Sequence, residues 1–174
     1  MKVPAAAAAA AGFDWFETGY PDGAVGGPMT QTNATLAAAG VRPFAYINLG
    51  ELAPSLAGIA KYTGQVLAHN SQWNTDSVDV TDPSWQRWIV ARADEAYAEG
   101  SRGVKWDVGT PTIPPGKTRA DVNAAIATMM SNIRANHPDL RFIFNQGESF
   151  MLAYPDLADA LENEGLMSVA AQLR

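Results

Sequence analysis

Carboxylates and amides stand where several short apolar segments of this sequence end, at residues 13–19, 42–51, 103–108 and 140–145. These residues are Glu17, Asn48, Glu51, Asp107, Asn145 and Glu148. A carboxylate in such a place can act as a nucleophile, as a general acid or base, or as a metal ligand. Two carboxylates that face each other across a cleft would suit the hydrolysis of a glycosidic bond.

Other kinds of catalytic site find little support. The two histidines, His69 and His137, are not spaced as metal ligands, and the acidic residues lie on separate segments, so we expect no metal and no other cofactor. The GxSxG motif of serine hydrolases is absent. Neither GxGxxG nor GxxxxGK[ST] follows a predicted strand, which weakens a nucleotide-binding interpretation. The chain has no cysteine, which excludes thiolate chemistry and disulfides.

The composition is that of a globular protein. The 174 residues suffice for one domain with a sizeable core, and 47% of them are hydrophobic against 17% charged. The net charge of -6 argues against a nucleic-acid partner and would favour a cationic ligand. No run of 18 apolar residues occurs, so we expect no membrane span.

Strand-like and helix-like segments alternate along the chain. Strands are predicted over 13–19, 42–51, 77–80, 103–108 and 140–145, and helices over 29–39, from Pro83 to Gly100, and after Thr118. Residues 52–75 are expected to be irregular, with a helix over 54–69 as one option. The alanine-rich residues 1–12 favour a helix over a targeting signal, and residues 13–174 are expected to form a single domain.

The ends of the two longest predicted helices carry clear signals. Asp82 before Pro83 is a favourable N-cap, and Thr118 with Asp121 forms a capping box. The second of these helices has an apolar stripe at helical spacing. The stripe consists of Val122, Ile126, Met129, Met130 and Ile133.

Alternating strands and helices predict an α/β fold with a parallel sheet. A doubly wound sheet and a (β/α)₈ TIM barrel both fit. Polar residues at the carboxyl ends of the strands favour the barrel, because barrel enzymes place their catalytic groups there. Aromatic residues near these ends could stack on sugar rings, with core packing as the alternative, favoured for Trp15 and Trp106. The four aromatic candidates are Trp15, Tyr20, Tyr46 and Trp106.

Three segments, in order along the chain, resemble the endo-α-1,4-polygalactosaminidase family, glycoside hydrolase family 114. They are VRPFAYINLGE at 41–51, the stretch from VDVTDPSW to GVKWDV at 78–108, and FIFNQGESFML at 142–152. The resemblance implies a TIM-barrel enzyme that cleaves polysaccharides containing α-1,4-linked galactosamine. It also implies a polysaccharide partner and a secreted or cell-surface location. A non-catalytic carbohydrate-binding or degenerate remnant of the same barrel is the alternative.

The resemblance also implies roles for individual residues. Asp107 matches the aspartate that ends the family's fourth strand and is expected to be the nucleophile. Glu164 is the best match to the second catalytic carboxylate, a glutamate on the sixth strand. A retaining mechanism would place the two carboxyl groups about 5–5.5 Å apart. The substrate is expected to contact Glu17, Tyr46, Asn48, Glu51, Lys105 and Asn145.

The sequence departs from the family pattern in three respects. Arg102 and Thr110 stand where the family has aspartates, which puts part of the substrate contact surface in doubt. Only about six strands are visible, whereas a complete barrel usually needs about 200 to 250 residues. The barrel is therefore expected to be partial, truncated after Glu164, and could close by self-association.

Two questions remain open at the level of sequence. Residues 157–164 have the periodicity of a helix that ends at a glycine, whereas the family resemblance predicts a strand. Lys105 and Asp107 lie on one face of the segment GVKWDV because side chains in a strand alternate. Since alternate barrel strands share interior layers, we expect Lys105 to pair with Glu162 below the catalytic carboxylates. The alternative is that Lys105 reaches solvent at an open edge.

Overall fold

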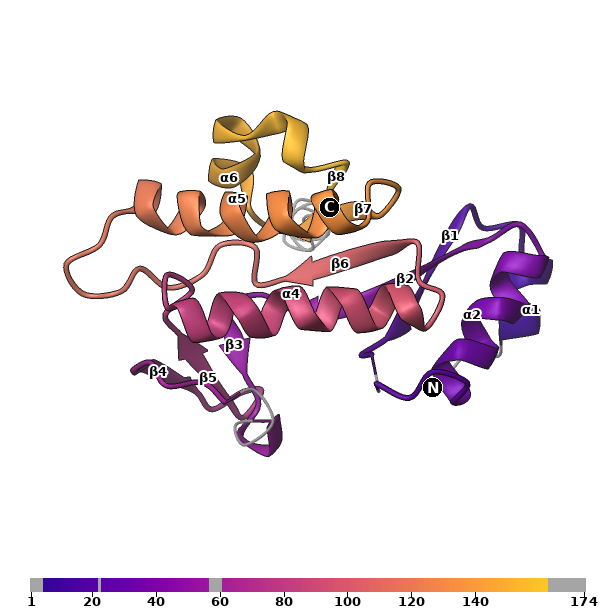
Figure 1. Ribbon diagram of the computed structural model, residues 1–174, viewed down its shortest axis with the longest axis horizontal. Coiled ribbons are helices and arrows are strands. Elements are labelled where there is room, and N and C mark those ends of the chain that lie inside the picture. Colours follow the sequence, from indigo (N-terminus) through magenta and orange to yellow (C-terminus); the bar gives the residue numbers. More distant parts are fainter. Residues whose placement is uncertain (1–4, 22, 57–60, 163–174) are drawn as a thin grey trace, which may run out of the picture.

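A parallel sheet of five strands forms the centre of the computed structural model, which describes residues 5–21, 23–56 and 61–162 (Figure 1). In spatial order the strands are β1 (Trp15–Gly19), β2 (Arg42–Asn48), β6 (Gly103–Asp107), β7 (Arg141–Asn145) and β8 (Ala160–Glu162). Every neighbouring pair in this order is parallel, so the carboxyl ends of all five strands meet at one edge.

Helices connect and cover these strands, as the alternating pattern predicted. They are α1 (Ala5–Ala10), α2 (Pro28–Ala38), α4 (Pro83–Ala98), α5 (Arg119–Asn136) and α6 (Glu148–Ala153), with short 3₁₀ turns η1 (Pro54–Leu56) and η2 (Pro155–Leu157). In Figure 1, α4 and α5 lie side by side along the sheet, while α1 and α2 pack together next to β1. The helix expected near the N-terminus is confirmed over Ala5–Ala10.

The residues between β2 and α4 form a separate small sheet, which corrects two predictions. Its strands are β3 (Glu51–Leu52), β4 (Val66–Asn70) and β5 (Thr75–Val78), paired antiparallel in the order β3-β5-β4. The predicted strand over 77–80 therefore belongs to this sheet and is not a barrel strand. The optional helix over 54–69 is wrong for its described part, because residues 66–69 pair with β5 and satisfy their hydrogen bonds there.

The predicted caps and apolar stripe are confirmed. The Asp82 side chain accepts from the backbone N–H of Ser84, and Thr118 and Asp121 cap each other's backbone N–H groups. Every residue of the α5 stripe is fully buried in the main core, and Trp85 and Trp106 are among the largest buried side chains. Local hydrogen bonds and one apolar face thus suffice to define α4 and α5.

Residues 160–162 form a strand, as the family resemblance predicted. β8 pairs in parallel with β7, with Glu162 opposite Asn145. The helical interpretation fails for these residues because the chain turns at η2 and returns to the sheet edge. Glu164 lies outside the described residues.

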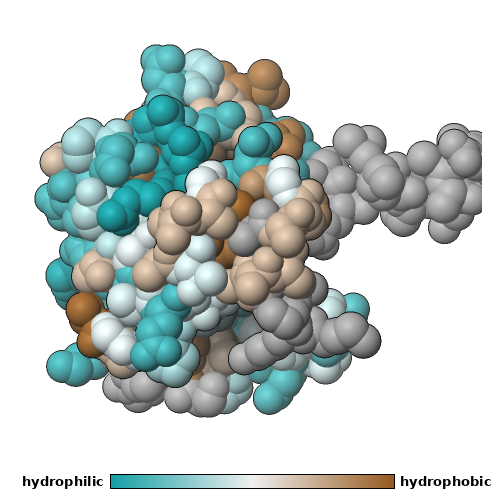
Figure 2. All heavy atoms as spheres, turned by 90° about the vertical axis from the view of Figure 1, so that its right-hand side faces the viewer, coloured by the Kyte–Doolittle hydropathy of each residue, from teal (hydrophilic) through white to brown (hydrophobic). Residues whose placement is uncertain are grey.

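On the face drawn in Figure 2, the most hydrophobic residues (brown) appear only as small separate spots, while mildly hydrophobic residues (tan) cover part of its centre. No helix among the described residues is both long and apolar enough to cross a membrane.

Candidate active site

A cleft of about 610 Å³ opens at the carboxyl ends of β2, β6 and β7. The residues that line it come from the central sheet and from the small sheet beside it. They include Tyr20, Tyr46, Asn48, Glu51, Asp107 and Asn145. Among the described lining residues, the charged ones are Glu51 and Asp107, so the charge in this cleft is negative.

Asp107 is fixed by hydrogen bonds to both of its carboxylate oxygens. Tyr46 donates its hydroxyl proton to Oδ2, and the Asn145 side-chain amide donates to Oδ1 at 2.9 Å. The three residues come from adjacent strands, since β6 lies between β2 and β7. Because both oxygens act as acceptors, the ionised carboxylate is the form that fits this arrangement. The structure thus brings together Asp107, Tyr46 and Asn145, which the sequence had identified separately.

Tyr46 remains a proton donor over a wide pH range. Burial, the hydrogen bond to Asp107 and the charge of that carboxylate raise its pKa well above the usual value of 10.0. Its ring packs against Tyr20 with centroids 5.3 Å apart. The Tyr20 hydroxyl accepts from the backbone N–H of Asn48 at 3.0 Å, which ties the aromatic pair to β2.

The backbone turns sharply after both site strands. Val108 and Gln146, which directly follow Asp107 and Asn145, have φ values of 53° and 61°. This left-handed region is unfavourable for a β-branched residue such as Val108, and such strain is typical of functional sites. Gly109 then approaches β7 closely, with its N–H donating to the Asn145 carbonyl at 3.0 Å.

We expect Gly109→Ala to destabilise the protein by about 2 kcal/mol, because the added methyl group has no space. A Cβ at Gly109 would lie 2.4 Å from the carbonyl oxygen of Gln146, which is rigid backbone. Urea unfolding measures the change. Gly116→Ala is the matched control, since a Cβ there meets no atom within 4 Å and only its positive φ costs about 1 kcal/mol. Equal losses in the two variants would contradict this explanation.

Lys105 forms an internal ion pair, as predicted, and has a second partner that the sequence did not reveal. Its Nζ lies 3.0 Å from Glu162 Oε2 and 3.2 Å from Glu17 Oε2, and the residue is only 8% exposed. The three side chains come from β1, β6 and β8, which are alternate strands of the sheet. That is the layering of a barrel interior. Whether Glu17 and Lys105 also contact substrate stays a prediction.

Four buried or paired groups among the described residues make the protein sensitive to alkaline conditions. Burial raises the pKa values of Tyr46, Tyr20 and Tyr62. For Lys105, burial acts to lower the pKa, but Glu162 and Glu17 outweigh it and the net shift is upward. A raised pKa means that the folded state holds its proton more tightly than the unfolded chain, so stability falls as pH rises above the unfolded value of about 10.

We therefore expect the free energy of unfolding to be constant from pH 7 to 9 and to fall between about pH 10 and 12. Urea unfolding across this range measures it. In Tyr46→Phe the fall should be smaller, because this residue no longer titrates. An equally steep fall in the variant would show that Tyr46 does not contribute.

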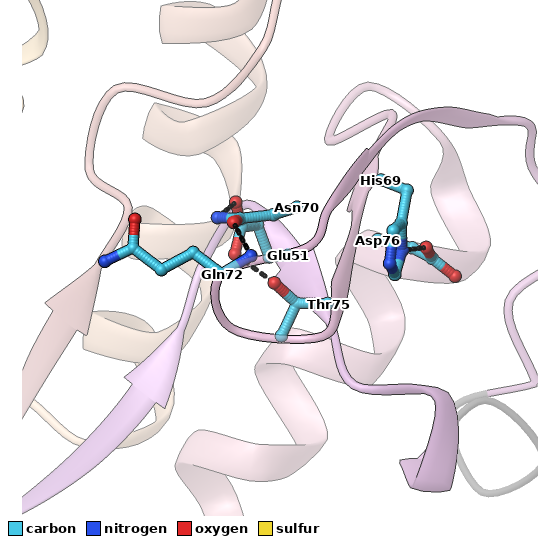
Figure 3. A network of polar contacts seen from close by, with 6 residues as sticks. All are labelled: Glu51, His69, Asn70, Gln72, Thr75 and Asp76. Carbon is cyan, nitrogen blue, oxygen red and sulfur yellow. Dashed lines mark hydrogen bonds and ion pairs between the residues drawn. The ribbon is translucent and has the colours of Figure 1, made fainter.

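Asn48 and Glu51 connect the cleft to the small sheet. Asn48 Oδ1 accepts from the backbone N–H groups of Gly50 at 3.1 Å and Glu51 at 2.8 Å. The Glu51 carboxylate in turn accepts from the Asn70 side chain at 3.1 Å and from the Thr75 hydroxyl at 2.5 Å (Figure 3). Glu51 lines the cleft as expected, but its carboxylate is engaged by the β4–β5 hairpin.

Two of the four aromatic candidates line the cleft and two do not. Tyr20 and Tyr46 line the cleft, Trp106 is fully buried in the core, and Trp15 packs against Phe44. The cleft also contains Trp73, which the sequence analysis missed because it treated residues 52–75 as irregular. Its surroundings, Asn-Ser-Gln-Trp-Asn-Thr, are typical of a hairpin turn and were the available signal.

Arg102, whose departure from the family pattern had put part of the substrate contact surface in doubt, does not line the cleft. It directly precedes Gly103, the first residue of β6, whereas the cleft lies at the opposite end of that strand. Its guanidinium packs over the ring of Tyr97, 4.8 Å from the centroid. Thr110 follows β6 and is exposed, but it does not line the cleft.

Comparison with known proteins shows that this chain has a known fold. The sequence model of glycoside-hydrolase family GH114 matches residues 3–170. The glycoside hydrolase domain of PelA from Pseudomonas aeruginosa has a TM-score of 0.73 and 23% identity, over 92% of this chain and 62% of that one. A comparison with curated proteins gives no match.

Two further solved structures share the fold. Aspergillus fumigatus Ega3, determined in complex with galactosamine, has a TM-score of 0.68 and 16% identity, over 86% of this chain and 66% of that one. The α-galactosidase TtGalA from Thermus thermophilus has a TM-score of 0.66 and 17% identity, over 90% of this chain and 36% of that one. The predicted TIM-barrel class is thereby confirmed, and the chain spans less than two thirds of each of these relatives.

Proposed function

Because the chain belongs to glycoside-hydrolase family GH114, we propose that it hydrolyses polysaccharides containing α-1,4-linked galactosamine. The observation that carries this proposal is the state of Asp107. It stands at the carboxyl end of β6, in an acidic cleft, with each oxygen bound by one donor. A carboxylate held in one orientation at a barrel mouth is suited to attack a sugar carbon.

The proposed mechanism uses two carboxylates and retains the anomeric configuration. Asp107 attacks the anomeric carbon while Glu164, assigned from the family resemblance, protonates the leaving oxygen. Glu164 then removes a proton from water, which releases the sugar from Asp107. Tyr46 and Asn145 keep the nucleophile aligned during both steps. The anomeric form of the first product, observed by NMR, distinguishes retention from inversion.

The negative charge of the cleft supports an amino sugar as substrate. A free amine on galactosamine is protonated near neutral pH, and the negative charge of the cleft would attract it as the polymer approaches. An overall charge of -6 adds a weak long-range attraction.

The test is the release of reducing ends from partially deacetylated α-1,4-galactosaminogalactan. We expect hydrolysis of this polymer and at least about tenfold slower hydrolysis of the fully N-acetylated form, because acetylation removes the positive charge. Equal rates on both polymers would contradict an amine-dependent site. A folded protein that binds the polymer without cleaving it would favour the non-catalytic alternative.

We further propose a secreted or cell-surface location, because a polysaccharide of this kind is met outside the cell. Self-association of the chain is a related proposal, which analytical ultracentrifugation tests directly.

A further inference from the structure

An exposed tryptophan lines the same cleft as Asp107 but belongs to a different sheet. Trp73 lies in the turn between β4 and β5 and is 69% exposed. Trp85, Trp88 and Trp106 are buried, and Trp15 is 42% exposed outside this cleft. An indole ring presented to solvent in a polar cleft offers a flat apolar surface with a polar edge, which suits the C–H face of a pyranose ring.

One carboxylate holds the turn that carries Trp73. Asn70 and Thr75 are the paired residues at which β4 and β5 meet the turn, and Glu51 accepts one hydrogen bond from each of them. Asn70 also accepts from the backbone N–H of Gln72 inside the turn, at 3.2 Å. Figure 3 shows Glu51 between these residues, while the separate pair of His69 and Asp76 lies on the other side of the hairpin.

The backbone of the same residue, Glu51, is connected to β2, the strand next to the one that carries Asp107. Asn48 is paired with Asp107 across β2 and β6, and its side chain holds the Glu51 backbone N–H at 2.8 Å. The position of the hairpin relative to Asp107 is therefore set by a short series of hydrogen bonds. Such a series can keep a remote binding surface at a fixed distance from the reacting carbon.

We propose that Trp73 forms a subsite that stacks on one sugar ring of the bound polymer, away from the bond that is cleaved. Glu51 is then a positioning residue that holds the Trp73 turn, and it does not itself bind the sugar. The identity of the polymer rests on the proposed function, whereas the subsite rests on Trp73, Glu51 and the hairpin. The ligand class is a chain of pyranose rings long enough to reach from Asp107 to Trp73.

Tryptophan fluorescence tests the subsite independently of catalysis. The Asp107→Asn protein is titrated with an α-1,4-linked galactosamine hexamer, which it does not consume, and then the titration is repeated with Trp73→Ala or Trp15→Ala added. We expect the hexamer to change the emission of the Asp107→Asn protein and of the Trp15→Ala variant, but not of the Trp73→Ala variant. A response that persists without Trp73, or no response in any variant, overturns the proposal.

Kinetics test the role of Glu51. In the otherwise unmodified enzyme we expect Trp73→Ala to raise KM for the polymer about tenfold with kcat little changed, because only binding remote from the reaction is lost. Glu51→Ala should give a similar rise, and the double variant should be no worse than Trp73→Ala alone. Additive effects would show that Glu51 contacts the sugar directly and would overturn its positioning role.

The two proposals fail in different ways. If the hexamer response depends on Trp73 but the parent enzyme does not cleave the polymer, the subsite is supported and the hydrolase is contradicted. Cleavage of the polymer with KM and fluorescence unaffected by Trp73→Ala supports the hydrolase and overturns the subsite.

Discussion

Replacing Asp107 by Asn is expected to reduce the release of reducing ends from partially deacetylated galactosaminogalactan by at least about 10³-fold, since the nucleophile of the reaction is removed. The amide has the same size, so the fold should persist. Only one of its two positions is an oxygen, so either Tyr46 or Asn145 loses its acceptor. The expected cost is about 1 kcal/mol in the free energy of unfolding.

The control for this variant is Asp76→Asn. Asp76 is also an aspartate on a strand, but it pairs with His69 on the side of the hairpin away from Glu51 (Figure 3). We expect it to retain the parent rate. Substantial hydrolysis by Asp107→Asn would remove Asp107 from the centre of the mechanism, and loss of activity in both variants would point to a general effect on folding.

Replacing Lys105 by Met is expected to destabilise the protein by about 3 kcal/mol, because the substitution leaves two carboxylates facing each other without a cation. Glu17 and Glu162 approach the same ammonium group from two strands of the sheet. Both are about one third exposed, so water limits the penalty to the lower end of the range for a broken buried pair. Urea unfolding at pH 7 measures the loss.

Neutralising the partners should restore most of this stability. In a triple variant with Lys105→Met, Glu17→Gln and Glu162→Gln, the two carboxylates that pair with Lys105 are neutralised together with it, and we expect recovery to within about 1 kcal/mol of the parent. Lys117→Met is the control, because Lys117 is exposed in a loop. No recovery in the triple variant would show that packing of the Lys105 side chain matters more than its charge.

Much of this fold follows from short stretches of sequence. Asp82 with Pro83 and Thr118 with Asp121 begin α4 and α5, because an N-cap satisfies backbone donors within three residues of itself. The placement of Asp107 at a strand end follows from the apolar run that precedes it. Even the pair of Lys105 with Glu162 could be predicted, because the alternation of side chains and the layering of alternate strands are geometric rules.

The tertiary structure decided the strand pairing and the contacts around the cleft, because both depend on which distant segments meet. A strand as short as β5 pairs wherever a partner edge is offered, and here the partners are β3 and β4 rather than the central sheet. The contact of Glu17 with Lys105 and the hydrogen bonds that fix Asp107 join residues more than 25 positions apart. The cleft likewise brings in Trp73 from a hairpin that belongs to another sheet than Asp107. The sequence by itself determined the helix ends and the residue types available for chemistry, since these are set by neighbours along the chain. Only the packing of strands and hairpin could place those residues around one cleft, since strand pairing and tilt are properties of the whole sheet.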